Sequence, residues 1–240
     1  IYIFYKVDPY KIYLYYIITN VISTKEKMVR NTFYVTYAFL LTTGTITFIE
    51  AIRTKEPKIR HILNLETVIS VVAAYFYSVF MKKITNKNID YKEINVTRYL
   101  DWAITTPVML LVLCLVFVYN NKTKLTAWFF LIVLILNYAM IGFGYLGETK
   151  KLNKNIAWVG GSIAFIVLYG LLYMTFIHGK KGFDNKMIFW TFLIFWSGYG
   201  LSYYLDDETR NINYNILDLF SKCFVGIFFW AYLTKVLVIF

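Results

Sequence analysis

The sequence predicts an all-α membrane protein in which seven transmembrane helices form one bundle. Of its 240 residues, 59% are hydrophobic and 20% are aromatic, which exceeds the usual share in soluble globular domains. Segments of roughly 20 mostly apolar residues, the length that crosses a bilayer, recur along the chain. They are continuously apolar, whereas barrel strands would alternate, and helices satisfy their own backbone groups in lipid.

Seven such segments follow one another, and each is separated from the next by a short polar segment. The expected spans are Tyr34–Ala51, Ile62–Met81, Arg98–Tyr119, Leu125–Leu146, Ile156–Ile177, Met187–Leu205 and Ile212–Phe240. We therefore expect residues 31–240 to form a single transmembrane domain in contact with membrane lipid.

Residues 1–30 mix Ile and Tyr with charged side chains, so they do not form the charged and then apolar pattern of a cleaved leader. We expect an interfacial segment here, with Ile12–Ile22 lying on the membrane surface. A short eighth span is the alternative.

The segment Lys82–Thr97 is the longest connection on one side of the expected bundle. Within it, "NKNIDYKEINVT" alternates apolar and polar residues around Asn and Asp. This pattern predicts a small β-hairpin that caps the bundle.

The formal net charge of +11 does not indicate a nucleic-acid partner, because Lys and Arg lie between the apolar spans rather than in one patch. Two connections carry the basic residues that mark a cytoplasmic side: Arg53, Lys55, Lys58, Arg60, Lys180, Lys181 and Lys186. This distribution favours an extracellular N-terminus. The opposite side also carries basic residues, which dilute the bias: Lys82, Lys83, Lys87 and Lys92.

Ionisable residues inside a span are costly, so each needs a partner or a task. Lys222 lies in the apolar run "ILDLFSKCFVGIFFW", and Asp218 lies one helical turn earlier on the same face. A desolvated lysine is a nucleophile that condenses with an aldehyde to give a Schiff base, and a nearby carboxylate can hold the protonated imine. A structural Asp–Lys pair is the alternative for this segment taken alone.

The third expected span supplies a second buried carboxylate. Its sequence "RYLDWAITTPVMLLV" places Arg98, Asp101 and Thr105 on one stripe of a helix. Arg-Tyr-x-Asp-Trp-x-x-Thr-Thr-Pro here, followed by Asp-x-x-x-Lys in the seventh span, resembles the microbial rhodopsins. The resemblance runs from the second span to the seventh.

The resemblance implies all-trans retinal bound as a Schiff base on Lys222. Asp101 and Asp218 match the paired counterions, Arg98 matches the arginine beneath them, and Thr105 matches the threonine that hydrogen-bonds Asp101. The family implies a light-activated transporter or photoreceptor and not an enzyme.

The resemblance also implies a set of side chains around the retinal. They are Trp102, Thr106, Met109, Met140, Gly144, Trp158, Trp196, Tyr199 and Tyr203, and we group with them Tyr77, which matches the tyrosine that bonds the seventh-span aspartate. Gly200 replaces the usual proline of the sixth span, and glycine permits a bend without enforcing one. Ordinary packing is the alternative for each aromatic residue, since the chain has 22 Tyr, 21 Phe and 6 Trp.

The transported ion and the transport mode depend on fewer residues. Outward proton pumps of this family carry a carboxylate eleven residues after the counterion, where this chain has Val112. Glu66 lies near the same end of the bundle and is either a functional carboxylate or a span-end residue that reaches headgroup water. In the last connection Asp206, Asp207 and Glu208 are interpreted as solvated.

Val112, together with a composition similar to that of rhodopsins from large algal viruses, favours a light-gated cation conductance. An outward proton pump is the alternative, and a sensory photoreceptor without net transport is the third class. Protons or small cations are the expected ions. The sequence does not decide whether the chain forms a homo-oligomer.

Overall fold

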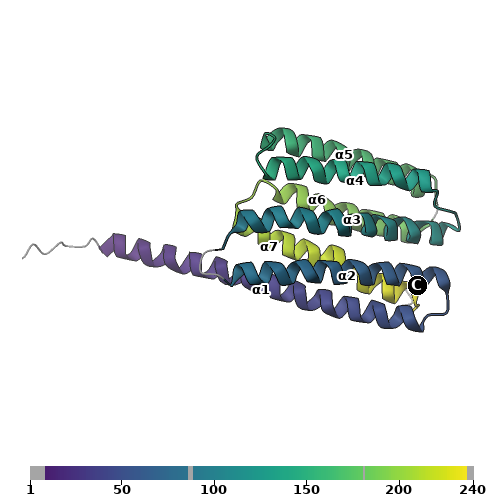
Figure 1. Cartoon of the computed structure of the whole chain (residues 1–240), viewed down its shortest axis with the longest axis horizontal. Coiled ribbons are helices and arrows are strands. Elements are labelled where there is room, and N and C mark those ends of the chain that lie inside the picture. The colour runs from purple at the N-terminus through teal and green to yellow at the C-terminus, as the bar shows by residue number, and fades with distance from the viewer. Residues whose placement is uncertain (1–8, 86–88, 181, 237–240) are drawn as a thin grey trace, which may run out of the picture.

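The bundle is built from helices that run up and down in chain order (Figure 1), and the computed structural model describes residues 9–85, 89–180 and 182–236. The elements are α1 (Pro9–Arg53), α2 (Pro57–Ile84), α3 (Tyr91–Asn121), α4 (Ala127–Glu148), α5 (Lys154–Phe176), α6 (Phe183–Ser202), α7 (Asp207–Asp218), the π-helical segment η1 (Leu219–Phe224) and α8 (Val225–Leu233). Because α7, η1 and α8 follow one another without a break, they form the seventh helix of the bundle.

The prediction of an all-α seven-helix bundle is confirmed. Within the described residues, six helices are long and apolar enough to cross a membrane, counting the stretch Asp207–Leu233 as one. Helix α6 is not one of these six, since Asp184, Asn185 and Lys186 in its first turn lower its mean hydropathy. It nevertheless packs between α5 and α7 as the sixth helix.

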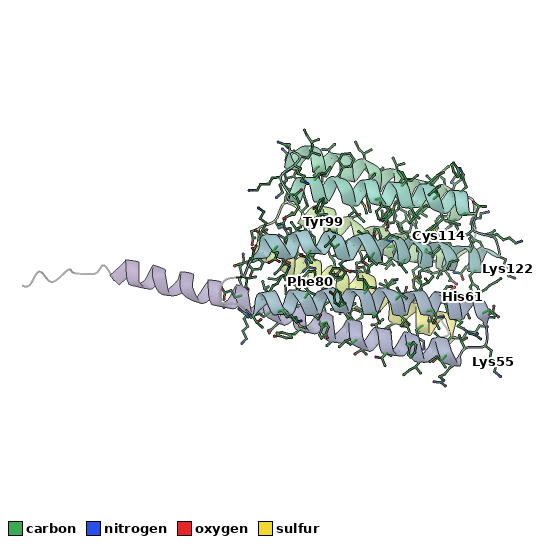
Figure 2. All side chains as sticks on the ribbon, in the orientation of Figure 1. Lys55, His61, Phe80, Tyr99, Cys114 and Lys122 are labelled. Atoms are coloured by element: carbon green, nitrogen blue, oxygen red, sulfur yellow. The ribbon has the colours of Figure 1, made fainter. Side chains whose placement is uncertain are left out.

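Consecutive helices are neighbours, and α1 also contacts α7, η1 and α8, which closes the bundle. Large apolar side chains cover the outer surface, among them Trp128, Phe183 and Leu201. Charged side chains gather at the ends: Figure 2 shows Lys55 and Lys122, from the α1–α2 and α3–α4 connections, at one end of the bundle. An apolar exterior with charged ends is what a lipid environment requires, and the chain is an integral membrane protein.

The predicted hairpin between Lys82 and Thr97 is wrong within the described residues. Helix α2 continues to Ile84, and α3 begins at Tyr91. The side chain of Asp90 accepts a hydrogen bond from the backbone N–H of Glu93 at 3.0 Å, so it caps the first turn of α3. An N-cap of this type favours the start of a helix over a strand. The alternation of apolar and polar residues carries no information about such a cap. Residues 86–88 lie outside the described residues.

The interfacial segment assigned to residues 1–30 stays a prediction. In the structure α1 runs without a break from Pro9 through Arg30 to Arg53, and its N-terminal part extends past the other helices in Figure 1. Residues 1–8 lie outside the described residues.

Helices α4 and α5 approach closely at Gly147. A Cβ atom on this residue would lie 2.6 Å from the Cβ of Ala157 on α5, and it would also overlap the hydroxyl of Tyr203. Small residues at such contacts let membrane helices pack against each other.

We expect Gly147→Ala to destabilise the protein by about 1–3 kcal/mol, because the added methyl group overpacks this contact. Thermal unfolding in detergent micelles, followed by circular dichroism, measures the effect as a lowered midpoint. Gly170→Ala on α5 is the matched control, since a Cβ there meets no atom within 4 Å. Equal midpoints for the two variants would contradict the expectation.

Candidate functional site

A buried lysine lies at the centre of the bundle. Lys222 occupies the π-helical segment η1 and is 2% exposed. Its Nζ lies 2.7 Å from Oδ2 of Asp101 on α3 and 3.3 Å from Oδ1 of Asp218. Single π-helical turns often occur at functional sites, where they change the direction of one side chain. The structure therefore brings the sequence-predicted lysine and both predicted carboxylates together.

The two carboxylates have different surroundings. Asp218 accepts hydrogen bonds from the hydroxyls of Tyr77 on α2, at 2.8 Å, and Tyr199 on α6, at 2.6 Å. Asp101 accepts a long hydrogen bond of 3.4 Å from the hydroxyl of Thr105, which also donates to the Asp101 backbone carbonyl at 2.8 Å. Neutral hydroxyl groups therefore stabilise the negative charge of Asp218 more than that of Asp101, whose short hydrogen bond comes from Lys222 Nζ at 2.7 Å.

Arg98 completes this charged centre and is fully buried. Its Nη1 lies 3.7 Å from Oδ2 of Asp218. The other guanidinium nitrogens donate to two asparagines of α7, Asn211 and Asn215. Sequence reasoning missed these asparagines, although their positions, seven and three residues before Asp218, place them on the same side of α7.

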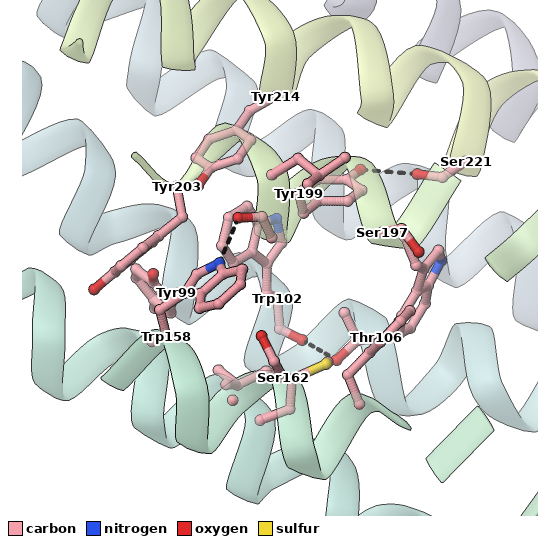
Figure 3. Close-up of a pocket in the computed structure, with 18 of the residues that line it drawn as sticks. Tyr99, Trp102, Thr106, Trp158, Ser162, Ser197, Tyr199, Tyr203, Tyr214 and Ser221 are labelled. Carbon is pink, nitrogen blue, oxygen red and sulfur yellow. Dashed lines mark hydrogen bonds between the residues drawn. The ribbon is translucent and has the colours of Figure 1, made fainter. Parts of the chain in front are cut away.

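A cavity of about 410 Å³ extends from Lys222 between α3, α4, α5, α6 and α7 (Figure 3). Nine predicted pocket residues line it together with Lys222: Trp102, Thr106, Met109, Met140, Gly144, Trp158, Trp196, Tyr199 and Tyr203. Tyr77 does not line it and contacts Asp218 instead. Sequence reasoning missed other lining residues, among them Tyr99, Ser162, Phe165 and Tyr214.

The walls of this cavity suit an apolar ligand. Most of the lining side chains are aromatic or aliphatic, and the volume falls within the range of about 300–1,000 Å³ typical of ligand pockets. The indole Nε1 atoms of Trp102 and Trp196 are buried and have no hydrogen-bond partner in residues 9–85, 89–180 and 182–236. Their rings therefore serve as apolar surfaces, with Lys222 as the charged end of the cavity.

Helix α6 passes through Gly200 and continues to Ser202. The indole N–H of Trp158 on α5 donates to the Gly200 carbonyl at 2.9 Å. This bond joins α5 to α6 at the edge of the cavity and fixes the register of Trp158.

Glu66 of α2 lies on the side of Lys222 that is opposite to Arg98. It is 3% exposed, and no hydrogen bond or ion pair engages its carboxyl group among the described residues. Its Oε2 lies 3.0 Å from the position that a Cβ on Gly226 would take, so the missing side chain of Gly226 makes room for it. Gly226 follows Lys222 by four residues, which is about 6 Å along a helix axis. Glu66 is therefore a buried carboxyl, not a span-end residue in headgroup water.

Buried apolar side chains surround this half of the bundle. Val112, at the position where the resemblance implies a carboxylate in proton pumps, is fully buried beside Leu113. Leu63, Phe192 and Phe229 belong to the same core.

A network of polar side chains leads from Arg98 to the opposite end. Asn211 donates to Asn95 at 2.8 Å, and Asn95 donates to Asp207 at 2.9 Å. Asp207 also pairs with Arg210, which binds Glu148 on α4 through two hydrogen bonds of 3.0 and 3.1 Å. The interpretation of Asp207 as a simply solvated residue is incomplete, since its half-exposed carboxylate joins α7 to α3.

A family model described as bacteriorhodopsin-like protein matches residues 28–236. The crystal structure of viral rhodopsin OLPVRII is similar at 48% identity, with a TM-score of 0.83 and coverage of 88% of this chain and 99% of that chain. Comparison with curated proteins gives no match.

Two other solved structures share the fold at lower identity. Blue light-absorbing proteorhodopsin from Med12 is 22% identical, with a TM-score of 0.69 and coverage of 86% of this chain and 96% of that chain. The proton pumping rhodopsin AR2 from the marine alga Acetabularia acetabulum is 18% identical, with a TM-score of 0.71 and coverage of 87% and 96%. Since the family model spans nearly the whole described bundle, including Lys222 and both buried aspartates, the chain belongs to the bacteriorhodopsin-like family, the microbial rhodopsins.

Proposed function

We propose that this protein is a light-driven outward proton pump that carries all-trans retinal on Lys222. The observation that carries the proposal is Glu66, a buried carboxyl without a partner among the described residues, packed against Gly226 one turn from Lys222. We place the N-terminus on the extracellular side of the membrane. The end of the bundle that carries Lys55 and Lys122 is then cytoplasmic.

The cavity supports the cofactor assignment. Trp102, Trp196 and Tyr199 would line the polyene, and Met109, Met140 and Gly144 would complete the walls. Retinal bound at Lys222 Nζ would supply light absorption and a change of shape that reorients the proton on that nitrogen. The residues of the chain then determine where this proton goes.

Asp101 is the better proton acceptor of the two carboxylates. Its Oδ2 lies 2.7 Å from Lys222 Nζ, and one long hydroxyl bond stabilises its charge. Asp218 accepts two short hydroxyl bonds, which stabilise its ionised form. In the transfer the N–H bond at Lys222 Nζ breaks and an O–H bond forms at Asp101 Oδ2. Arg98 stays charged and pairs with Asp218.

Glu66 would return a proton to Lys222 from the cytoplasmic side. Burial favours the neutral form of a carboxyl group, which is the form that can donate. Val112 and Phe229 belong to the same buried apolar core as Ile62, Leu63 and Ile69 of α2, and such a core would oppose a continuous water path in the dark. A closed cytoplasmic half with one proton-carrying group supports stepwise transport of protons rather than a pore for hydrated cations.

A light-gated cation conductance is the second candidate, and it is the one that the sequence alone favours. The observation behind it is Val112, which cannot donate a proton from the position that holds a carboxylate in outward pumps of the family. A sensory photoreceptor without net transport is the third class.

Lys222→Ala should abolish the visible absorption band of the protein purified with all-trans retinal, because the variant lacks the amine that binds the aldehyde. Absorption spectroscopy measures the loss. Lys124→Ala, in the exposed α3–α4 connection, is the control and should keep the band. A visible band of unchanged position and intensity in Lys222→Ala would exclude this attachment site.

Photocurrents distinguish the pump from the conductance. With identical solutions on both sides of the membrane and no applied voltage, we expect a steady outward current under illumination, since a pump works without a gradient. A passive pore would give no current under these conditions, and its current would change sign with the electrochemical potential. A light-induced current that reverses with the cation gradient would contradict the proposed pump and support the conductance.

Glu66→Gln should slow the recovery of the dark state by about tenfold or more, because a positioned acid typically contributes 10²–10⁴-fold to proton transfer. Flash-induced absorption changes measure the rate. Val112→Asp in the Glu66→Gln background should restore part of the rate by supplying a carboxyl from α3. Glu56→Gln, an exposed glutamate at the same end, is the control. Recovery that is as fast in Glu66→Gln as in Glu56→Gln would remove Glu66 from the proton path.

A further inference from the structure

The guanidinium of Arg98 is held mainly by neutral amides rather than by carboxylates. Its Nε and Nη2 donate to Oδ1 of Asn211 at 3.1 and 3.0 Å, and Nη2 also donates to Oδ1 of Asn215 at 2.5 Å. Its Nη1 lies 3.7 Å from Asp218 and has no hydrogen-bond partner within the part of the chain that the structure describes. The position of this charge therefore depends on two amide oxygens.

Asn211 and Asn215 lie one turn apart on α7, and each is anchored by other helices. Asn211 donates to Asn95 on α3 at 2.8 Å and to the backbone carbonyl of Asp207. Asn215 donates to Thr32 on α1 at 3.0 Å. Both asparagines are fully buried, so their amide groups have few other orientations that satisfy their hydrogen bonds.

The rest of the Arg98 environment does not select one position along α7. The rings of Phe33, Tyr77, Phe80 and Tyr214 lie between 5.0 and 5.8 Å from its guanidinium carbon. Such cation–π contacts stabilise the charge over a broad surface and have little directional preference compared with hydrogen bonds.

We infer that Asn211 and Asn215 are positioning residues that limit the movement of Arg98. Asn211 acts as an outer stop, which holds Arg98 away from Asp101, and Asn215 acts as an inner stop, which holds it near Asp101. Together they fix the distance of the guanidinium from the two carboxylates and so set the proton affinity of Asp101. The inference rests on the proposed function, in which Asp101 accepts the proton from Lys222.

Other charged and titratable groups face this centre from every element packed against it. Lys222 and Asp218 belong to the seventh helix. Tyr77 approaches from α2 and bonds both Asp218 and Oδ1 of Asn215, and Tyr199 approaches from α6 and bonds Asp218. Helix α1 contributes the uncharged groups of Phe33 and Thr32 near Arg98 and Asn215. Among these charges, Arg98 is the cation whose position the two asparagines determine.

The two stops predict opposite effects. Removal of the outer stop by Asn211→Leu leaves Asn215 and Asp218 as acceptors, so Arg98 moves toward the carboxylates and stabilises their ionised forms. Removal of the inner stop by Asn215→Leu leaves Asn211, so Arg98 moves outward and this stabilisation weakens. A charge that approaches or leaves a carboxylate in a buried site typically moves its titration by about one pH unit or more.

The experiment is an acid titration of the visible absorption band in the retinal-bound protein. Protonation of Asp101 shifts the band to longer wavelength, and Asp101→Asn should remove this transition. We expect the midpoint to fall by about one pH unit in Asn211→Leu and to rise by about one pH unit in Asn215→Leu. Asn213→Leu is the matched control, since Asn213 lies on the same helix and bonds Ser202 rather than Arg98. Its midpoint should equal that of the wild type.

Failure of the inference can be distinguished from failure of the proposed function. If the wild type titrates and Asp101→Asn does not, midpoints that stay at the wild-type value in both leucine variants, or that shift in the same direction, overturn the two-stop assignment alone. A wild type without a visible band overturns the proposed function as well. If a leucine variant gives no visible band, Asn211→Ala and Asn215→Ala, which remove the acceptor of Arg98 without adding bulk, carry the same expectations.

Discussion

A lysine in the interior of a membrane bundle is a charge that lipid and apolar side chains cannot solvate. In this protein Lys222 is balanced by Asp101 and Asp218, and the second negative charge is balanced by Arg98. The four side chains carry no net formal charge, which offsets much of the cost of their burial. The arrangement of the helices around them provides the hydrogen bonds that each member still requires.

The two carboxylates differ in the hydrogen bonds that they accept. Tyr77 and Tyr199 donate hydrogen bonds to Asp218 from α2 and α6, and Arg98 lies 3.7 Å from the same carboxylate. Asp101 faces Lys222 with one long hydroxyl bond. In the proposed pump, Asp218 would mainly balance the charge of the lysine, and Asp101 would accept its proton. The π-helical segment η1 matters here, because it sets where Lys222 points between the two.

The two ends of the bundle differ in the chemistry that they offer to a proton. On the outer side, amides and ion pairs connect Arg98 through Asn211 and Asn95 to Asp207 near the end of the bundle. On the inner side, Glu66 is the one buried carboxyl group among the described residues, and a largely apolar core occupies this half. The two halves of the bundle therefore differ in polarity on either side of the buried centre. Vectorial transport requires such an asymmetry, which supports the proposal of a pump.

The sequence by itself determined the features that depend on spacing within one helix. Continuous apolar runs gave the seven helices, the four-residue spacing of Asp218 and Lys222 placed them on one face, and the "RYLDWAITTP" run placed Arg98, Asp101 and Thr105 on another. The prediction of a hairpin before α3 was wrong because Asp90 caps the first turn of a helix. The alternation of apolar and polar residues does not contain this information. Contacts between helices were decided only by the tertiary structure, since they depend on how each helix is rotated and how closely it packs. The space at Gly226 that receives Glu66, the hold of Asn211 and Asn215 on Arg98, and the ion pair of Glu148 with Arg210 all join residues whose sequence separation carries no periodic signal.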